Sequence, residues 1–468
     1  MESSVTMPLN QNKHLKQQFV SNLTGSSMLE ISLVITSLSI VALLRQAFGL
    51  FVTRDIHSGT SLKKDDNATI KDRSLKTYVT SVSVDFLCII VPYILLLTVF
   101  SEWIYGNAAI TLLLLILLII VARFQCTIFQ GDEPHNIRES ISCYRVCMML
   151  VTCLSILAVD FKIFPRRYAK TETYGTSMMD LGVGSFVVAN SLVSRQARGI
   201  LVRNWKNALL STCPLTFLGF ARLISTRGVD YQVHVGEYGV HWNFFFTLAA
   251  VAILTSVINV PPSSCGILGL FILVGYQGFL LNGLNEYLLS DKRETNIVSM
   301  NKEGIFSIFG YWGMYLIGVQ LGNYLFFQRP TSVVQRTMGW SRVRVWIICL
   351  AFWLLTFFTD RYVERVSRRM CNLSYVMLVL ALNLQVLSIM MISYYIPGRK
   401  ISILGEAFNK NMLGSFLLAN VFTGLVNLSV DTLSVSSATA LAILIIYSLI
   451  LSAVTAAADF VGFRLKFW

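Results

Sequence analysis

The sequence has unusually little charge. Of its 468 residues, 13% are charged and 54% are hydrophobic, and the mean hydropathy is +0.63. Soluble globular domains carry about 25% charged residues. About half of that fraction leaves too little polar surface for a particle in water. The composition therefore excludes a soluble protein and predicts an all-α polytopic membrane protein with no soluble domain.

The common sequence signatures of acyl transfer and nucleotide chemistry are also missing. No histidine is followed five residues later by aspartate, and there is no GxSxG turn, no GKS or GKT phosphate loop and no DHHC cysteine centre. The nine cysteines include no CxxC pair, and several stand inside apolar runs. We interpret them as small buried hydrophobic residues, and we expect no metal site.

Long apolar runs are what the sequence has instead. A membrane-spanning helix needs about 20 mostly apolar residues. Thirteen runs are candidates: 28–52, 77–100, 104–122, 144–161, 176–194, 206–225, 241–260, 264–282, 303–327, 345–360, 373–396, 412–430 and 436–461. We expect a polar N-terminal segment at 1–27, a single transmembrane catalytic domain at 28–461 and a short tail at 462–468. Because the connections are short, the spans and loops must carry any chemistry.

Basic residues between the apolar runs produce a net charge of +13. In this setting they favour anionic lipid headgroups or phosphate-bearing substrates over nucleic acid. Loops on one side of the spans, with the C-terminal tail, hold 22 Lys and Arg, and the segments on the other side, with the N-terminus, hold 15. Because cytosolic loops carry the excess of Lys and Arg, we expect the first side in the cytosol and the N-terminus in the lumen. Loops 162–175 and 361–372 carry four basic residues each on the lumenal side. They indicate a function that needs positive charge there, unless the topology is inverted or a span is miscounted.

A dense run of polar residues begins where the fourth apolar run ends. Asp160 ends that run, and Lys170 follows ten residues later, with Arg166 and Arg167 between them. Pro165 should interrupt any helix in this stretch. A carboxylate at the mouth of a span that faces a basic loop can act as a general base. The alternative is a helix-end residue whose side chain reaches water.

A second polar stretch lies at a loop-to-span junction. His234, Glu237 and His241 have the spacing of one helical face, and Asn243 follows them. Two intervening glycines argue against a helix, so hydrogen bonding to a polar substrate or within the protein is favoured over metal binding.

Two further groups stand near span ends. Asn301 is a candidate helix N-cap, and Glu303 would favour the positive end of the same helix dipole. Arg365, Arg368 and Arg369 share one helical face, and arginine suits bidentate phosphate contact. A plain anchor at the membrane surface is the alternative for the arginines.

Polar residues also occur within the apolar runs. Asn420 and Asn427 are seven residues apart with Thr423 between them, so they form a polar stripe that faces another helix or a cavity. Asp85 and Asp180 lie deeper in their runs, as functional groups or as structural partners of polar neighbours.

Long blocks of the sequence resemble the inositol acyltransferases of glycosylphosphatidylinositol-anchor biosynthesis. The likeness runs nearly end to end, through KQQFVSNLTGSSMLEI, ILAVDFKIFPRRYAKTETYGTSMMDLGVGSFV, YQVHVGEYGVHWNFFFT, NKEGIFSIFGY, VSRRMCNL and LLANVFTGLVNLSVDT. Departures are small: Lys162 and Tyr168 stand where the family usually has Pro and Phe, and Val233 replaces a Glu. None of them falls on Asp160 or Lys170.

The resemblance implies transfer of a fatty acyl chain from acyl-coenzyme A, such as palmitoyl-coenzyme A, to the inositol 2-hydroxyl of glucosaminyl-phosphatidylinositol. The site would be the endoplasmic-reticulum membrane, and no cofactor is implied. Positions matching Asp160 and Lys170 look like the catalytic pair, with Asp160 as base and Lys170 as its partner or as an oxyanion stabiliser. The expected substrate-binding residues are Arg166, Arg167, His241, Asn243, Asn301, Arg368, Arg369 and Asn427.

Two other functions share many of these features. A transporter or flippase for a lipid or anionic metabolite would also have many spans with polar residues inside them. It would not require Asp160 and Lys170 close together at one membrane face. A non-catalytic subunit of a glycolipid-synthesis complex is the third possibility, and acyl transfer by the purified chain distinguishes all three.

Overall fold

The computed structural model describes residues 18–19, 21–57, 75–126, 137–200, 205–226, 235–327, 338–396 and 402–464. Within these ranges the regular structure is helical, and extended pairing is limited to two isolated bridges, of Gly25 and of Ser26 with Thr176. Ten helical segments are long and apolar enough to cross a membrane. The prediction of an all-α polytopic membrane protein is confirmed.

Three predicted spans correspond to shorter apolar helices. The runs predicted at 176–194, 206–225 and 241–260 contain the apolar helical stretches Leu181–Leu192, Thr212–Ser225 and Phe244–Ile258. The third begins late because the side chain of Asn243 caps it by accepting from the amides of Phe245 and Phe246. It ends at Asn259, which is in the left-handed region with φ +42°. That these three helices cross the membrane stays a prediction.

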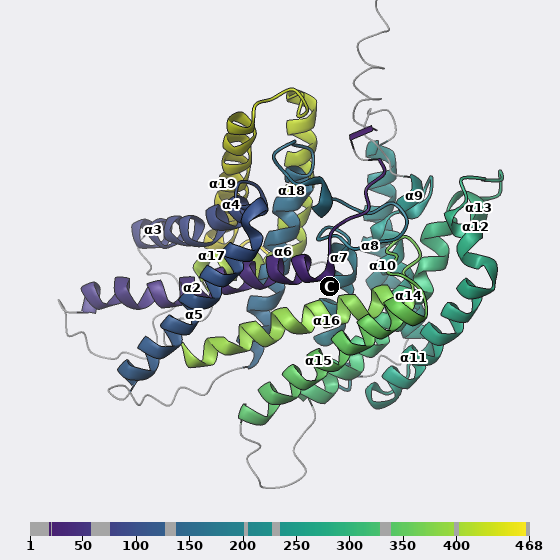
Figure 1. The fold of residues 1–468 in the computed structure, drawn as a ribbon, viewed down its shortest axis with the longest axis horizontal. Coiled ribbons are helices and arrows are strands. Elements are labelled where there is room, and N and C mark those ends of the chain that lie inside the picture. Colours follow the sequence, from purple (N-terminus) through teal and green to yellow (C-terminus); the bar gives the residue numbers. More distant parts are fainter. Residues whose placement is uncertain are drawn as a thin grey trace, which may run out of the picture. The chain divides into compact units, whose positions relative to one another are not determined.

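The chain divides into two compact units, and unit 1 comprises Met1–Met28, Arg166–Leu384 and Phe467–Trp468. Its helices are α7 (Leu181–Leu192), α8 (Trp205–Thr226), α9 (Val235–Tyr238), α10 (Phe244–Ile258), α11 (Pro262–Phe279), α12 (Asn285–Leu289), α13 (Ile297–Met300), α14 (Lys302–Gly322), α15 (Met338–Tyr362) and most of α16 (Leu373–Met390). α14 is central, because α7, α9, α10, α11 and α13 all pack against it. Figure 1 shows α11 and α14 lying side by side.

Glycines let α14 approach α7 closely. A Cβ on Gly322 would lie 2.3 Å from the carbonyl oxygen of Leu192, at the end of α7. Gly318, four residues earlier, is equally close to α7, where it faces the side chain of Ser191. Small residues four apart are typical of close helix contacts in membranes, where attraction between helices comes from packing and not from the hydrophobic effect.

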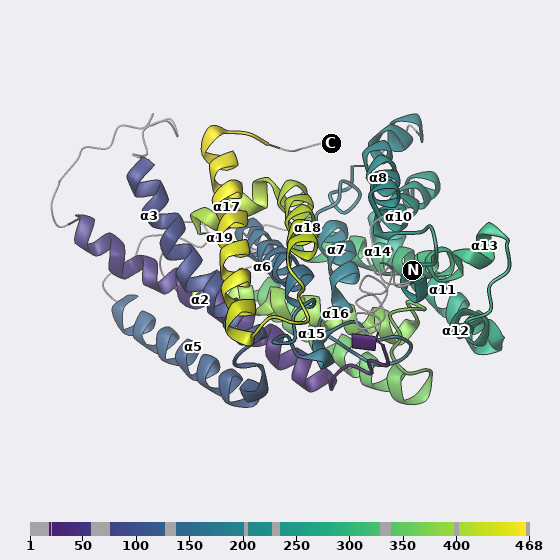
Figure 2. The same ribbon diagram turned by 90° about the horizontal axis from the view of Figure 1, so that it is seen from above.

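Unit 2 comprises Leu29–Pro165 and Gln385–Lys466. Its helices are α2 (Met28–His57), α3 (Leu75–Asp85), α4 (Val91–Leu97), α5 (Ile104–Cys126), α6 (Ile137–Ala158), α17 (Ile403–Lys410), α18 (Met412–Ser429) and α19 (Ser437–Val461). The short α17 packs against α3, α6 and α19. α6, α18 and α19 contact one another and run together in Figure 2.

A buried ion pair joins three helices of unit 2. The fully buried carboxylate of Asp85 accepts a hydrogen bond from Nε of Arg45 at 2.6 Å and one from the amide of Leu404, in the first turn of α17, at 3.0 Å. An ionised group within apolar helices is costly unless it is paired. Of the two roles left open for Asp85, these contacts support the structural one.

The close contact between α14 and α7 makes a stability prediction. We expect Gly322→Ala to lower the free energy of unfolding by about 1–3 kcal/mol, because the added methyl group meets backbone that cannot rotate away. Thermal unfolding of the purified protein in detergent measures the loss. Gly275→Ala on α11 is the matched control, since its Cβ would meet nothing within 4 Å. Equal melting temperatures for both variants would contradict the packing described.

Candidate functional site

Five segments that the sequence places on one side of the spans meet in unit 1. They are the N-terminal segment and loops 162–175, 222–240, 283–302 and 361–372. Hydrogen bonds and ion pairs join each of them to at least one other. Contact among the five agrees with the predicted arrangement, and the assignment of this side to the lumen stays a prediction.

The loop that carries Lys170 is held on both sides of this residue. Tyr168 is fully buried, and its carbonyl oxygen accepts from the amide of Met179 at 3.1 Å. The amide and the hydroxyl of Thr171 donate to the carboxylate of Asp180 at 3.2 and 2.8 Å. The buried ring and the backbone hydrogen bonds therefore fix where the Lys170 side chain begins.

Four charged side chains form a connected cluster around this loop. The Nζ of Lys170 donates to both carboxylate oxygens of Glu237, each at 2.9 Å. Arg368 contacts the same carboxylate with Nη1 at 2.9 Å, and its Nε lies 2.9 Å from Oδ1 of Asp180 as an ion pair. Asp180 in turn holds Thr171, next to Lys170. The cluster has two positive and two negative groups, and its contacts close into a ring.

The ionisation of Glu237 follows from its neighbours. Burial by itself favours the protonated carboxyl, but the charges of Arg368 and then Lys170 outweigh burial and hold the pKa of Glu237 well below its usual value. Because the folded-state pKa is depressed, this pairing stabilises the fold above the unfolded-state pKa of about 4.3. The stabilisation is lost as pH falls toward the folded-state pKa. Because that pKa is far below 7, Glu237 is anionic at neutral pH.

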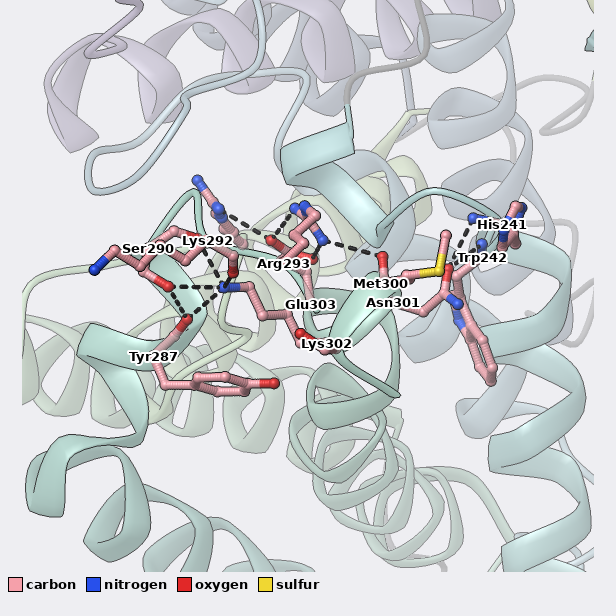
Figure 3. A network of polar contacts seen from close by, with 12 residues as sticks. His241, Trp242, Tyr287, Ser290, Lys292, Arg293, Met300, Asn301, Lys302 and Glu303 are labelled. Atoms are coloured by element: carbon pink, nitrogen blue, oxygen red, sulfur yellow. Dashed lines mark hydrogen bonds and ion pairs between the residues drawn. The ribbon is translucent and has the colours of Figure 1, made fainter. Parts of the chain in front are cut away.

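The neighbouring arginine, Arg369, is also paired within the protein. Its Nη2 lies 3.0 Å from Oε1 of Glu303, in the first turn of α14. Arg293 reaches the same carboxylate with two nitrogens at 2.6 and 3.0 Å and also donates to the carbonyl oxygen of Met300, as Figure 3 shows. Both Arg368 and Arg369 are thus buried and have their charge compensated by carboxylates of the protein.

Lys302 fastens the preceding loop without any carboxylate. Its side chain is fully buried, and Nζ donates to the carbonyl oxygens of Tyr287, Ser290 and Lys292 and to the Ser290 hydroxyl, at 2.6–3.2 Å (Figure 3). Tyr287 and Ser290 stand at the end of α12, so the ammonium satisfies carbonyls that a helix terminus leaves open.

Asn301, His241 and Asn243 mainly shape the backbone. Asn301 stands at the N-cap position of α14, but its side chain makes no capping hydrogen bond, contrary to the prediction. Its Oδ1 instead accepts from the amides of His241 and Trp242, at 2.8 and 3.0 Å (Figure 3). Asn243 caps α10 and donates to the carbonyl oxygen of Gly219. That these three residues contact a substrate stays a prediction.

The N-terminal segment lies against the loop that carries Lys170. The amide of Ser26 donates to the carbonyl oxygen of Thr176 at 2.7 Å, and the hydroxyl of Thr176 returns a hydrogen bond to Ser26 at 2.6 Å. The Arg166 guanidinium lies 3.9 Å from the centre of the Phe19 ring, within cation–π range. Arg167 lies over the ring of the following tyrosine at 5.1 Å.

Asp160 belongs to unit 2 and has its own partner there. It lies in the turn after α6, and its Oδ2 accepts from the Asn427 amide on α18 at 2.7 Å. Asn427 also donates to the carbonyl oxygen of Thr423, which orients the amide. The polar stripe on the twelfth predicted span therefore reaches Asp160, a contact between residues 267 positions apart.

Sequence reasoning missed the carboxylates that organise this site. Glu237 and Glu303 were interpreted as part of a weak metal motif and as a helix-dipole residue, although each stands near a basic loop in a chain with few acids. Among the described residues, no group of three His, Cys, Asp or Glu is arranged to hold a metal ion. His234 lies outside the described residues.

Comparison with known proteins gives consistent matches over nearly the whole chain. Residues 12–458 match the GWT1 family. An uncharacterized protein of Arabidopsis thaliana is 52% identical over 92% of this chain and 98% of its own length. The Phosphatidylinositol-glycan biosynthesis class W protein of Dictyostelium discoideum is 32% identical, over 98% of this chain and 99% of its own. The mouse (Mus musculus) Glucosaminyl-phosphatidylinositol-acyltransferase PIGW is 31% identical, over 97% and 98%.

The cluster of ion pairs around Lys170 makes a prediction for Arg368. Arg368→Gln removes the buried cation between the buried Asp180 and the largely buried Glu237, and breaking a buried ion pair costs about 3–5 kcal/mol of folding free energy. We expect a large fall in melting temperature and in the yield of monodisperse protein. Arg365→Gln, in the same loop but exposed, is the control. A variant at Arg368 that is as stable as wild type and binds substrate more weakly would instead indicate direct substrate contact.

Proposed function

We infer that this chain, which belongs to the GWT1 family, is a glucosaminyl-phosphatidylinositol acyltransferase that acylates inositol in glycosylphosphatidylinositol-anchor biosynthesis. The observation that carries this conclusion is the match over nearly the full length to the GWT1 family and to the mouse protein whose name states this activity. The charged loops of unit 1 suit a substrate with a phosphate group, because arginine and lysine are the side chains that bind phosphate.

The acyl donor we propose is a fatty acyl-coenzyme A such as palmitoyl-coenzyme A. The inositol hydroxyl oxygen attacks the thioester carbonyl carbon, the carbon–sulfur bond breaks, and an ester and the coenzyme A thiol are formed. The hydroxyl proton passes to a base on the enzyme and then to the departing sulfur. No separate cofactor is needed for this exchange, and direct transfer avoids an acyl-enzyme.

Asp160 is the base we propose. An alcohol is a weak nucleophile and gains from a carboxylate that accepts its proton in the transition state. The amide of Asn427 supports this role because its hydrogen bond to one carboxylate oxygen, at 2.7 Å, orients the group. We therefore assign Asn427 to orientation of Asp160.

Lys170 is the positive group we propose for the same reaction. Its side chain is 39% exposed, whereas that of Arg368 is 4% exposed. An ammonium near the thioester can stabilise the negative oxygen of the tetrahedral intermediate. Arg166 and Arg167, half-buried in the same loop, are proposed to hold a phosphate.

The buried pairing of Arg368 and Arg369 favours a supporting role for both residues over direct phosphate contact. We propose the endoplasmic-reticulum membrane as the location, with the loops of unit 1 facing the lumen. A transporter or flippase remains the rival class of function. It predicts substrate movement without a new ester, so mass spectrometry of glucosaminyl-phosphatidylinositol after incubation with the purified chain and palmitoyl-coenzyme A separates the two.

The base assignment predicts the behaviour of one isosteric variant. Asp160→Asn keeps the size of the side chain and removes the basic oxygen, so turnover should fall by about 10²–10⁴-fold. The product is measured by mass spectrometry on protein of verified monodispersity. Asp431→Asn, an exposed carboxylate beyond the end of α18, is the control and should be near normal. Near-normal acylation by a well-folded Asp160→Asn enzyme would contradict the assignment of Asp160 as the general base.

A further inference from the structure

Glu237 makes the cluster around Lys170 possible. It lies on α9, a four-residue helix between α8 and α10, and is 67 residues from Lys170 in the sequence. Both of its carboxylate oxygens are 2.9 Å from the Lys170 ammonium, and only 13% of its side chain is exposed. A two-oxygen contact at this burial restricts a flexible side chain much more than a surface salt bridge does.

The segment that carries Glu237 is fixed independently of Lys170. Gly239 has φ +104°, and a Cβ there would lie 2.5 Å from the Cα of Asn301. A Cβ on Gly236 would come within 3.3 Å of the Arg369 guanidinium. The side-chain oxygen of Asn301 also accepts hydrogen bonds from the backbone amides of His241 and Trp242, which follow Gly239 in the chain. These close approaches hold the loop against Asn301 and Arg369, so the position of Glu237 does not depend on Lys170 alone.

We propose that Glu237 is the positioning residue for Lys170. It fixes the ammonium at a defined place, so that Lys170 acts as a stationary cation and hydrogen-bond donor. Among the contacts of the described residues, two N–H groups of Lys170 point to Glu237, which leaves the third for the reacting oxygen. The proposal rests on the acyl transfer and on the role of Lys170 given above.

A purely structural role for Glu237 predicts a loss of stability, whereas the positioning role predicts a loss of turnover. Arg368 has a second carboxylate, Asp180, whereas Lys170 has Glu237 as its recorded ion-pair partner within the described residues. Removing the charge of Glu237 therefore leaves Arg368 paired and Lys170 without a fixed position. The loss should appear in turnover more than in stability.

The test compares Glu237→Gln with Asp459→Asn in the full-length protein. Asp459 lies in unit 2 and pairs with Lys410 at 2.9 Å. The side chains of Lys410 and Asp459 are 35% and 12% exposed, close to the 39% and 13% of Lys170 and Glu237. We expect Glu237→Gln to lower kcat on the order of 10²-fold, as misplacement of a reacting group does, with KM changed less than about threefold. Asp459→Asn should change the melting temperature similarly and leave kcat within about twofold.

Glu237→Asp completes the experiment. It keeps the negative charge beside Arg368 but shortens the reach to Lys170, so it should fold like wild type and still lose about tenfold in kcat. If Glu237→Gln does not fold, this variant decides the question. Normal kcat in folded Glu237→Asp and Glu237→Gln, or a fall in kcat matched by Asp459→Asn, would overturn the proposal. Absence of acyl transfer by the wild-type protein would overturn the proposed function first, and normal kcat in Lys170→Ala would overturn the role of Lys170.

Discussion

The guanidinium of Arg368 holds unit 1 together at its polar end. It lies between Glu237 and Asp180, two carboxylates that reach it from segments 131 and 188 residues away along the chain. A buried charge is tolerated only with opposite charge and hydrogen bonds around it. Each acid of this cluster also holds another residue, Lys170 or Thr171, so charge compensation links three loops of unit 1.

The cluster changes how basic loops in a membrane protein are interpreted. Arginines beside a span are usually taken as anchors for lipid headgroups or as ligands for phosphate. Among the described residues, the buried Arg368 and Arg369 are internal cations that hold acids in place, and the partly exposed Lys170 is the residue proposed to face a substrate. Counting basic residues in a loop therefore overestimates the charge that the loop offers to a ligand.

Much of the fold was predictable from the sequence, since hydropathy reports the apolar length that a bilayer requires. The runs at 176–194 and 241–260 were predicted longer than α7 and α10, and for α10 the reason is that the caps at Asn243 and Asn259 have no hydropathy signal. The run at 206–225 agrees with α8 to within one residue at each end. Asp160 and Lys170 were recognisable as candidates from a polar run at a span end and from the family resemblance. Their partners were not, because Asn427 and Glu237 reach them across 267 and 67 residues. The contact between Lys170 and Glu237 was especially hard to predict, because Gly236 and Gly239 beside Glu237 argue against a helix at α9.

The pairing of Lys170 with Glu237 also bears on a chemical hazard of the proposed reaction. A neutral amine attacks a thioester readily, and the product is an amide, which is much more stable than the thioester. An ammonium held against a carboxylate has no lone pair to offer, so it can polarise the acyl group without capturing it. In the proposed reaction, the same ion pair that orients the side chain would also protect the enzyme from acylating itself.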